Sequence, residues 1–231
     1  MENYKRQEEI LEFLKKRHFA SIAEIAEVQY TSQATVRRDI AKLEAKGIVK
    51  SVYGGVVMTE YERSPVPSYL REKENSSAKE LIARSAAEFI KDNTTVILDA
   101  STTVRRMCKY IKGRKGLTVI TNGLNICEEL CESDIKVLCT GGEFIKKREC
   151  FVGYIAEDFL RNIKADMVFF SSQGISDNGD ITDSSSVEVS IRRAMLASAN
   201  EKFFLCDSSK RNKDYTYKLC NISDVDQAIF D

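Results

Sequence analysis

The sequence predicts two domains of different fold: a small N-terminal winged helix-turn-helix domain and a larger α/β domain whose mainly parallel sheet is covered by helices on both faces. In the first 60 residues, three helical patterns precede a short hairpin pattern. From residue 78 onward, helical patterns alternate with short strands rich in β-branched residues. Between them lies a stretch with Pro65, Pro67 and little periodic apolar content. The expected boundaries are 1–59, a linker over 60–77, and 78–231.

The first two helices are predicted from apolar spacing and capping residues. Residues 3–17 place apolar side chains at helical spacing among charged ones. Ser21 and Glu24 have the spacing of a capping box, in which each side chain satisfies an unpaired amide at a helix start. A short helix ending near Val28 is therefore expected.

A third helix and a hairpin complete the N-terminal domain. Ser32 is a suitable capping residue for a helix that ends at Gly47. Residues 48–52 and 56–59 alternate weakly between apolar and polar side chains around the turn Tyr53-Gly54-Gly55. These strands are expected to form the wing.

The second domain is predicted because segments with the apolar spacing of helices alternate with short segments that have the pattern of strands. The expected helices are 78–90, 103–111, 124–131, 155–160 and 188–199, and the expected strands are 95–98, 117–121, 135–139, 167–170 and 202–206. Because helices separate the strands, a parallel arrangement is expected.

Composition excludes several classes of protein. The 35 basic and 35 acidic residues balance, so no overall field draws the chain to polyanions. His18 is the single histidine, which excludes a histidine-based triad elsewhere in the chain. Seven cysteines without a Cys-x-x-Cys pair are expected to be reduced, buried thiols, and no metal or cofactor is expected. Neither a signal peptide nor a membrane span is recognisable, so a cytoplasmic protein without membrane contact is expected.

The charges are unevenly distributed. Residues 1–57 hold ten basic and eight acidic side chains, and residues 28–58 hold five basic and two acidic ones. Neutrality of the whole chain therefore leaves room for a local basic face.

The third helix has the pattern of a DNA-reading helix. Its apolar stripe of Val36, Ile40 and Leu43 leaves small and basic residues on the opposite side, including Ala41. Alanine methyls allow close approach to a major groove, and arginine reaches guanine edges or phosphates. Asp39 is expected to pair internally with a basic side chain. The expected contacts to double-stranded DNA are Ser32, Gln33, Ala34, Thr35, Arg37, Arg38, Lys42 and Tyr53. The alternative is an ordinary solvated charged face.

These residues resemble a known family. The run from Thr31 to Ile40, followed by Leu43-Glu44, Gly47 and Tyr53-Gly54-Gly55-Val56, is similar to the recognition helix and wing of DeoR-family bacterial transcription regulators. Ile40 departs from the leucine usual in the family, a change confined to the core.

Polar residues follow several predicted strands of the second domain. Residues 99–103, Asp-Ala-Ser-Thr-Thr, offer backbone amides and hydroxyls that suit a phosphate, although serine and threonine also cap helices without any ligand. Thr121-Asn122-Gly123, Thr140-Gly141-Gly142 and Gln173-Gly174 follow other strands, and Lys210 follows the last. The carboxyl ends of parallel strands share one edge, where ligands bind.

This series is similar to the DeoR-type sensor domain, which is related in fold to ribose-5-phosphate isomerase and to coenzyme A transferases. The family form of the first loop is Asp-x-Gly-Thr-Thr, so Ser101 replaces a glycine. Relatives normally continue through a further short helix and strand after Asp231. Glu188 and Lys210 also match family positions. The expected effector contacts are Asp99, Ser101, Thr102, Thr103, Asn122, Gly141, Gly142, Gly174, Glu188 and Lys210.

The resemblance implies a transcription regulator, most often a repressor of a carbohydrate-metabolism operon, that acts as a homodimer or larger homo-oligomer and responds to a phosphorylated sugar. The alternative from another class is a sugar-phosphate isomerase-like enzyme with a DNA-binding appendage, because carboxylates and a lysine at a sheet edge can shuttle protons. A dinucleotide sensor is disfavoured, since no Gly-x-Gly-x-x-Gly follows a predicted strand.

Overall fold

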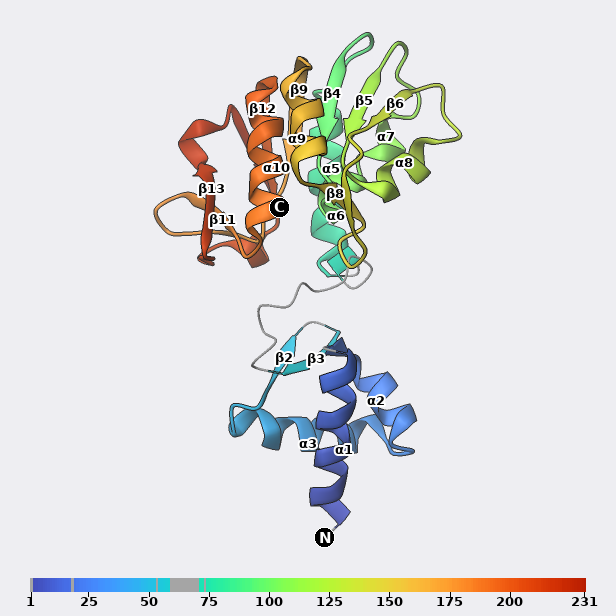
Figure 1. Cartoon of the computed structure of the whole chain (residues 1–231), viewed down its shortest axis with the longest axis vertical. Coiled ribbons are helices and arrows are strands. Elements are labelled where there is room, and N and C mark those ends of the chain that lie inside the picture. Colours follow the sequence, from blue (N-terminus) through green and yellow to red (C-terminus); the bar gives the residue numbers. More distant parts are fainter. Residues whose placement is uncertain (1, 18, 53, 59–70, 73) are drawn as a thin grey trace. The chain divides into compact units, whose positions relative to one another are not determined.

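The computed structural model describes residues 2–17, 19–52, 54–58, 71–72 and 74–231 of the chain. They divide into two compact units, Met1–Glu74 and Asn75–Asp231, which are described separately (Figure 1). Most of the expected linker lies outside the described residues. Its expected end at residue 77 is wrong, because α5 (Ser76–Ala87) includes Ser76 and Ser77. Serine is well tolerated in a first helical turn, where it competes least with backbone hydrogen bonds.

The N-terminal unit contains α1 (Glu2–Arg17), α2 (Ile22–Val28) and α3 (Gln33–Ala45). The predicted capping box is present: the amide of Glu24 donates to Ser21 Oγ at 3.1 Å, and the amide of Ser21 donates to Glu24 Oε2 at 2.8 Å. The start of α2 is therefore fixed by Ser21 and Glu24, as predicted. The start of α3 is fixed by its capping residue Ser32, also as predicted.

A small antiparallel sheet closes this unit. The wing strands β2 (Val49–Val52) and β3 (Gly55–Met58) pair as predicted, and β3 also pairs with β1 (Phe19–Ala20). The two-residue strand β1 is too short for its periodicity to be recognised in the sequence. Apolar residues of α1, α2, α3 and the sheet form one core, which includes Ile10, Leu14 and Val36.

A buried ion pair joins α1 to α3. Arg6 Nε donates to Asp39 Oδ2 at 2.6 Å, and the Asp39 side chain is 2% exposed. The prediction that Asp39 serves an internal basic partner is confirmed. As a consequence, this carboxylate is withdrawn from the solvent-facing side of α3.

The larger unit contains a six-stranded parallel sheet in the order β14-β12-β9-β4-β5-β6. Its strands are β4 (Thr95–Leu98), β5 (Thr118–Thr121), β6 (Lys136–Cys139), β9 (Ala165–Phe170), β12 (Ala199–Cys206) and β14 (Gln227–Phe230). The chain proceeds in one direction from β4 to β6 and in the other from β9 to β14. The sheet therefore reverses its order between β4 and β9, and their carboxyl ends mark a topological switch point.

Helices cover both faces of this sheet, as the sequence predicts (Figure 1). One face packs against α5, α6 (Thr102–Arg105), α7 (Cys108–Ile111) and α8 (Leu124–Leu130), and the other against α9 (Tyr154–Arg161) and α10 (Ser186–Ala197). The single helix expected over 103–111 is wrong, because it is broken into α6 and α7. Consecutive β-branched residues at 102–104 weaken helix propagation there.

The sixth strand of the large sheet, β14, and two smaller elements were not expected from the sequence. The hairpin of β7 (Glu143–Ile145) and β8 (Cys150–Val152) follows β6. A second sheet consists of β10 (Gly174–Ile175), β11 (Asp180–Asp183) and β13 (Tyr217–Asn221), with short 3-10 turns at Ser208–Lys210 and Ile222–Asp224. Strands of two to five residues give too little alternation to be recognised.

Across the described ranges, no helix combines the length and apolar character needed to cross a bilayer. Within the same residues, no group of three or more His, Cys, Asp or Glu side chains is placed to hold a metal ion.

We expect Arg6→Met to destabilise the N-terminal unit, because it leaves the buried Asp39 carboxylate without this cation. The free energy of unfolding should fall by about 1–3 kcal/mol, the cost of an unsatisfied buried group. Hydrogen exchange of α3 amides in the full chain measures the loss. Lys15→Met, which breaks an exposed pair with Glu12, is the matched control and should change exchange little. Equal protection in both variants would contradict a role for the Arg6–Asp39 pair.

Candidate nucleic-acid interface and effector site

The solvent-facing side of α3 carries cations and small side chains. Arg37, Arg38 and Lys42 are exposed, as are Gln33 and Ala34. Val36, Ile40 and Leu43 on the opposite side are buried. Since Asp39 is turned into the ion pair with α1, the exposed side keeps a basic character that suits phosphates and guanine edges.

Ser32 and Thr35, two expected DNA contacts, also have a role within the helix. The amide of Thr35 donates to Ser32 Oγ at 3.2 Å, and the two hydroxyl oxygens lie 2.9 Å apart. Ser32 is exposed, so its capping role leaves it at the surface. Both hydroxyls sit at the start of the helix, where helix-turn-helix proteins contact phosphates and bases.

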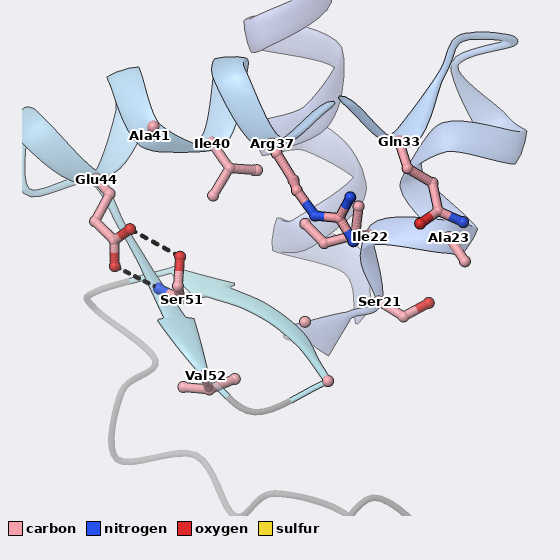
Figure 2. A pocket seen from close by; sticks show the side chains of 12 residues that line it. Ser21, Ile22, Ala23, Gln33, Arg37, Ile40, Ala41, Glu44, Ser51 and Val52 are labelled. Carbon is pink, nitrogen blue, oxygen red and sulfur yellow. Dashed lines mark hydrogen bonds between the residues drawn. The ribbon is translucent and has the colours of Figure 1, made fainter. Parts of the chain in front are cut away.

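A hollow of about 560 Å³ lies between α3, the wing and the start of α2. Figure 2 shows Gln33 and Arg37 pointing from α3 into this hollow, toward Ser21, Ile22 and Ala23. The wing contributes Ser51, Val52, Gly54 and Gly55. Tyr53, the expected wing contact, lies outside the described residues.

Glu44 fixes the wing relative to α3. Its two carboxylate oxygens accept hydrogen bonds from the amide and the hydroxyl of Ser51, each at 2.7 Å (Figure 2). These bonds lower the pKa of Glu44, the backbone amide of Ser51 having the largest effect. The carboxylate form thus holds β2 against the recognition helix.

At the carboxyl edge of the large sheet, Asp99 lies at the switch point. Its Oδ1 accepts the amide of Ser101 at 3.0 Å, and its Oδ2 accepts the amide of Ser171 at 3.3 Å. Arg192 Nε donates to the same Oδ2 at 2.9 Å. Asp99 therefore ties together the loops that follow β4 and β9 and anchors both to α10.

Arg192 joins three buried carboxylates. Besides Asp99, its Nη1 donates to Asp183 Oδ2 at 2.9 Å, and its Nη2 lies 3.5 Å from Glu188 Oε1. Burial alone would lower the pKa of Arg192, but the charges of Asp183, Asp99 and Glu188 together raise it. The guanidinium is thus permanently charged and holds β4, β11 and α10 in one arrangement.

Arg148 extends this cluster from the β7–β8 turn. Its side chain is 3% exposed, and its Nε lies 3.3 Å from Glu188 Oε2, within ion-pair distance. The geometry of this contact is not that of a hydrogen bond, and Nε has no hydrogen-bond partner among the described residues. Glu188 is therefore shared by two guanidinium groups. This buried cluster of Asp99, Arg148, Asp183, Glu188 and Arg192 is called the charge cluster below.

Lys210 lies beside the charge cluster. Its Nζ donates to Ser171 Oγ at 2.7 Å, and Ser171 is the residue whose amide binds Asp99. Lys210 Nζ also lies 3.8 Å from Asp207 Oδ2. Burial would raise the pKa of Asp207, but Lys210 and hydrogen bonds from Ser209 and Asn75 lower it. The structure thus places Lys210 at the same sheet edge as Asp99, as the sequence predicts.

Residues 101–103 form the start of α6 and are buried. Ser101 Oγ accepts the amide of Val104 at 3.2 Å and so caps α6. Thr102 is 8% exposed and Thr103 is fully buried, with its hydroxyl unpartnered among the described residues. Asn122 accepts the amide of Ala100 and donates to Phe151 O, so it links the loops after β4 and β5.

The glycines after β6 and β9 allow close approach of neighbouring backbone. Gly142 has a φ of 107°, and a Cβ there would lie 2.5 Å from Val152 O. A Cβ at Gly174 would overlap the carbonyl of Lys213. Gly142 thus packs against the β8–α9 connection, whereas Gly174 packs against the segment before β13. Gly141 also has a positive φ, of 65°.

The structure brings Asp99, Ser101, Glu188 and Lys210 together through direct contacts or one shared partner, and Asn122 adjoins them. Arg148, Asp183, Ser171 and Arg192 are absent from the expected contacts, yet the same network contains them. Arg148 ends the run Lys146-Lys147-Arg148, which has the pattern of an exposed basic stretch, so its burial leaves no sequence signal. A hollow of about 290 Å³ in this unit is lined by residues outside the charge cluster, namely Ile175, Ser176, Asp177, Arg211, Asn212 and Phe230.

Comparison with known proteins identifies related chains over nearly the full length. Transcriptional repressor AccR of Agrobacterium fabrum is 33% identical over 98% of this chain and 88% of its own. The L-fucose operon activator of Haemophilus influenzae is 32% identical over 99% of this chain and 92% of its own. The lactose phosphotransferase system repressor of Staphylococcus epidermidis is 31% identical over 100% of this chain and 93% of its own.

Two solved structures match part of the chain at low identity, and the first of them shares the α/β fold. The tetrameric eIF2B-beta2-delta2 complex of C. thermophilum matches with a TM-score of 0.50 and 16% identity, over 70% of this chain and 57% of that one. The ribose 5-phosphate isomerase of Methanocaldococcus jannaschii matches with a TM-score of 0.45 and 14% identity, over 60% of this chain and 55% of that one.

Two family models cover the described fold. The DeoR-like helix-turn-helix domain matches residues 6–62, and the DeoR C terminal sensor domain matches residues 74–231. Together with the full-length relatives, these matches show that the chain belongs to the DeoR family of transcription regulators.

Proposed function

We propose that this chain is an operator-binding repressor of a carbohydrate-metabolism operon, and that a phosphorylated sugar bound at the charge cluster and Lys210 lowers its affinity for DNA. The observation that carries the DNA-binding part is the basic exposed side of α3, with Arg37, Arg38 and Lys42 at the surface and Asp39 held inside by Arg6. Two of the three relatives named above are repressors, and two names refer to fucose or lactose, which supports a sugar-related operon.

Operator recognition by this α3 requires more than one copy of the chain. One recognition helix contacts too few base pairs for operator specificity, whereas a symmetric pair doubles the contacts. We therefore propose a homodimer or larger homo-oligomer on a palindromic double-stranded site. The Glu44–Ser51 bonds support a wing held ready beside each helix.

The effector is proposed to bind where the loops after β4, β9 and β12 meet. The charge cluster contains three carboxylates and two guanidinium groups, so it does not attract an anion by itself. Lys210 and the backbone amides of Thr102 and Thr103, in the first turn of α6, supply the positive side for a phosphate. Carboxylates such as Asp99 and Glu188 are acceptors suited to sugar hydroxyl groups.

Linkage to DNA requires that the effector bind two conformations unequally. An effector that binds one conformation about 100-fold more tightly than the other shifts the equilibrium between them by roughly 2.7 kcal/mol. Asp99 contacts the loops after β4 and β9 and also α10, so a ligand that displaces one of its partners changes the position of several elements. This shared anchoring supports an allosteric sensor rather than a passive binding site.

We also propose that the sensor unit binds its ligand without converting it. A sugar-phosphate isomerase needs a carboxylate or lysine free to accept a proton. Here Asp99 and Glu188 are held by Arg192 and Arg148, and Lys210 donates to Ser171. Fold relationship to isomerases does not confer their chemistry.

For the DNA side, Arg38→Ala should weaken specific binding by about 1–3 kcal/mol and relax base preference. Lys42→Ala should weaken specific and random DNA alike and reduce the salt dependence. Fluorescence anisotropy with DNA from upstream of the chain's own gene, at several salt concentrations, measures both. An equal loss on specific and random DNA for both variants would show that the reading face is assigned wrongly.

For the effector side, calorimetric titration with a panel of sugar phosphates should give binding by one class of them. Lys210→Ala should reduce that affinity at least about tenfold, as expected for loss of a charge-assisted contact. Lys202→Ala, in the middle of β12 and four residues before its last residue Cys206, is the control and should bind normally. If the folded protein binds DNA but shows no heat of binding with any sugar phosphate of a broad panel, the sensor proposal is wrong.

The enzyme alternative is tested with ribose 5-phosphate as substrate. We expect no turnover above the uncatalysed rate. Turnover that is lost in both Lys210→Ala and Asp99→Asn would overturn the proposal that the unit only binds its ligand.

A further inference from the structure

Two cysteines meet at the edge of the large sheet. Cys139 is the last residue of β6, the strand at one end of the sheet order. Cys127 lies one turn into α8, and its amide contacts Gly123 O at the start of that helix. Because α8 connects β5 to β6, which pair with each other, the helix runs back along the strand that ends in Cys139.

Side-chain alternation places both thiols on the same side of β6. Val137 packs against the core that contains Ile126 and Leu130 of α8. Leu138 packs against the core on the other face. Since alternate residues of a strand share a face, Cys139 lies on the side of Val137, which is the side that α8 covers.

The two thiols interact directly. The Cys127 thiol donates a hydrogen bond to the sulfur of Cys139, and this bond lowers the pKa of Cys139 to about 6. Burial opposes that shift, and a hydrogen bond from the backbone amide of Gly141 adds to it. The same contact with Cys139 raises the pKa of Cys127. These opposite shifts favour the thiolate at Cys139 and the thiol at Cys127.

The remaining cysteines differ from this pair. Burial raises the pKa of Cys108 to about 12, so its thiol stays protonated, and Cys150 and Cys206 are also buried. Cys131 is exposed at the end of α8, one turn beyond Cys127. Cys139 is exposed and Cys127 is half-buried, so this pair is more accessible to an oxidant in solution than Cys108, Cys150 and Cys206.

We propose that Cys127 and Cys139 are a redox modification site, at which a peroxide converts two thiols into an intramolecular disulfide beside Gly141 and Gly142. The proposal does not depend on the identity of the operator or the metabolite. It revises the expectation that every cysteine of the chain is an inert buried thiol.

The reaction balances with hydrogen peroxide as the two-electron oxidant. The Cys139 thiolate attacks one peroxide oxygen, the O–O bond breaks, and the departing hydroxide takes a proton to leave as water. Cys127 then loses its proton and attacks the sulfur of the Cys139 sulfenic acid, whose S–O bond breaks to release a second water. Two thiols and one peroxide give one disulfide and two waters.

Disulfide formation has a local structural consequence. A disulfide holds its sulfurs about 2.05 Å apart, closer than any thiol–thiolate hydrogen bond. The bond therefore draws the end of β6 toward α8 and removes the thiolate that accepts the Gly141 amide. Gly141 is followed by Gly142, which packs against Val152, so we expect oxidation to alter this short segment first.

The test uses the full-length reduced protein, treated with hydrogen peroxide, blocked with N-ethylmaleimide and digested with trypsin. Cleavage after Lys115, Lys136 and Lys146 separates the peptide with Cys127 and Cys131 from the peptide with Cys139. We expect these two peptides to be disulfide-linked within a monomeric chain. The link should persist in Cys131→Ser, the matched control, and fall at least about tenfold in Cys127→Ser.

Three results would overturn the proposal. One is a link that survives in Cys127→Ser but not in Cys131→Ser, which assigns the reaction to Cys131. Another is cross-linking between chains. The third is a Cys139 that stays fully alkylated by maleimide after peroxide treatment. Circular dichroism of each serine variant establishes that a lost link does not reflect unfolding, and faster hydrogen exchange of residues 140–142 after oxidation reports the altered loop.

Discussion

The α/β unit depends on one buried cation, Arg192. Its guanidinium contacts Asp99 after β4, Asp183 in β11 and Glu188 in the first turn of α10. Taking one cation and three carboxylates out of water is costly, and the cost is offset only when the geometry and hydrogen bonds are good. Neutralising Arg192 would leave buried carboxylates uncompensated, so these elements are constrained to move together. The same constraint places Lys210 and Ser171 beside Asp99 at the switch point of the sheet.

The N-terminal unit also contains a buried ion pair, but this pair has a different structural effect. The Arg6–Asp39 pair removes the carboxylate of α3 from its exposed side and fixes α1 against α3. What remains exposed on α3 is small or basic, which is the composition that a major groove requires. In one unit a buried ion pair shapes a surface for DNA, and in the other it orders the loops proposed to hold a ligand.

The sequence predicted those features that depend on neighbours in the chain. The capping box of Ser21 and Glu24, the start of α3 at Ser32 and the alternation of helices and strands all follow from local patterns. Sequence patterns also indicated an internal partner for Asp39, but not Arg6, which lies 33 residues away. Arg148 was not predicted, because only tertiary packing buries an arginine in a run of basic residues. The contact between Cys127 and Cys139 likewise depends on how α8 lies on β6.

The central claim is that the DNA site and the effector site are thermodynamically linked, and reciprocity of that linkage tests it most directly. Affinity for the active sugar phosphate is measured by calorimetry with and without saturating operator DNA, and affinity for the operator is measured with and without saturating sugar phosphate. Thermodynamic linkage predicts that both ratios are the same and differ from one, because each ligand must change the affinity for the other by one common factor. A sugar phosphate that binds equally well to the free and the DNA-bound protein would contradict it.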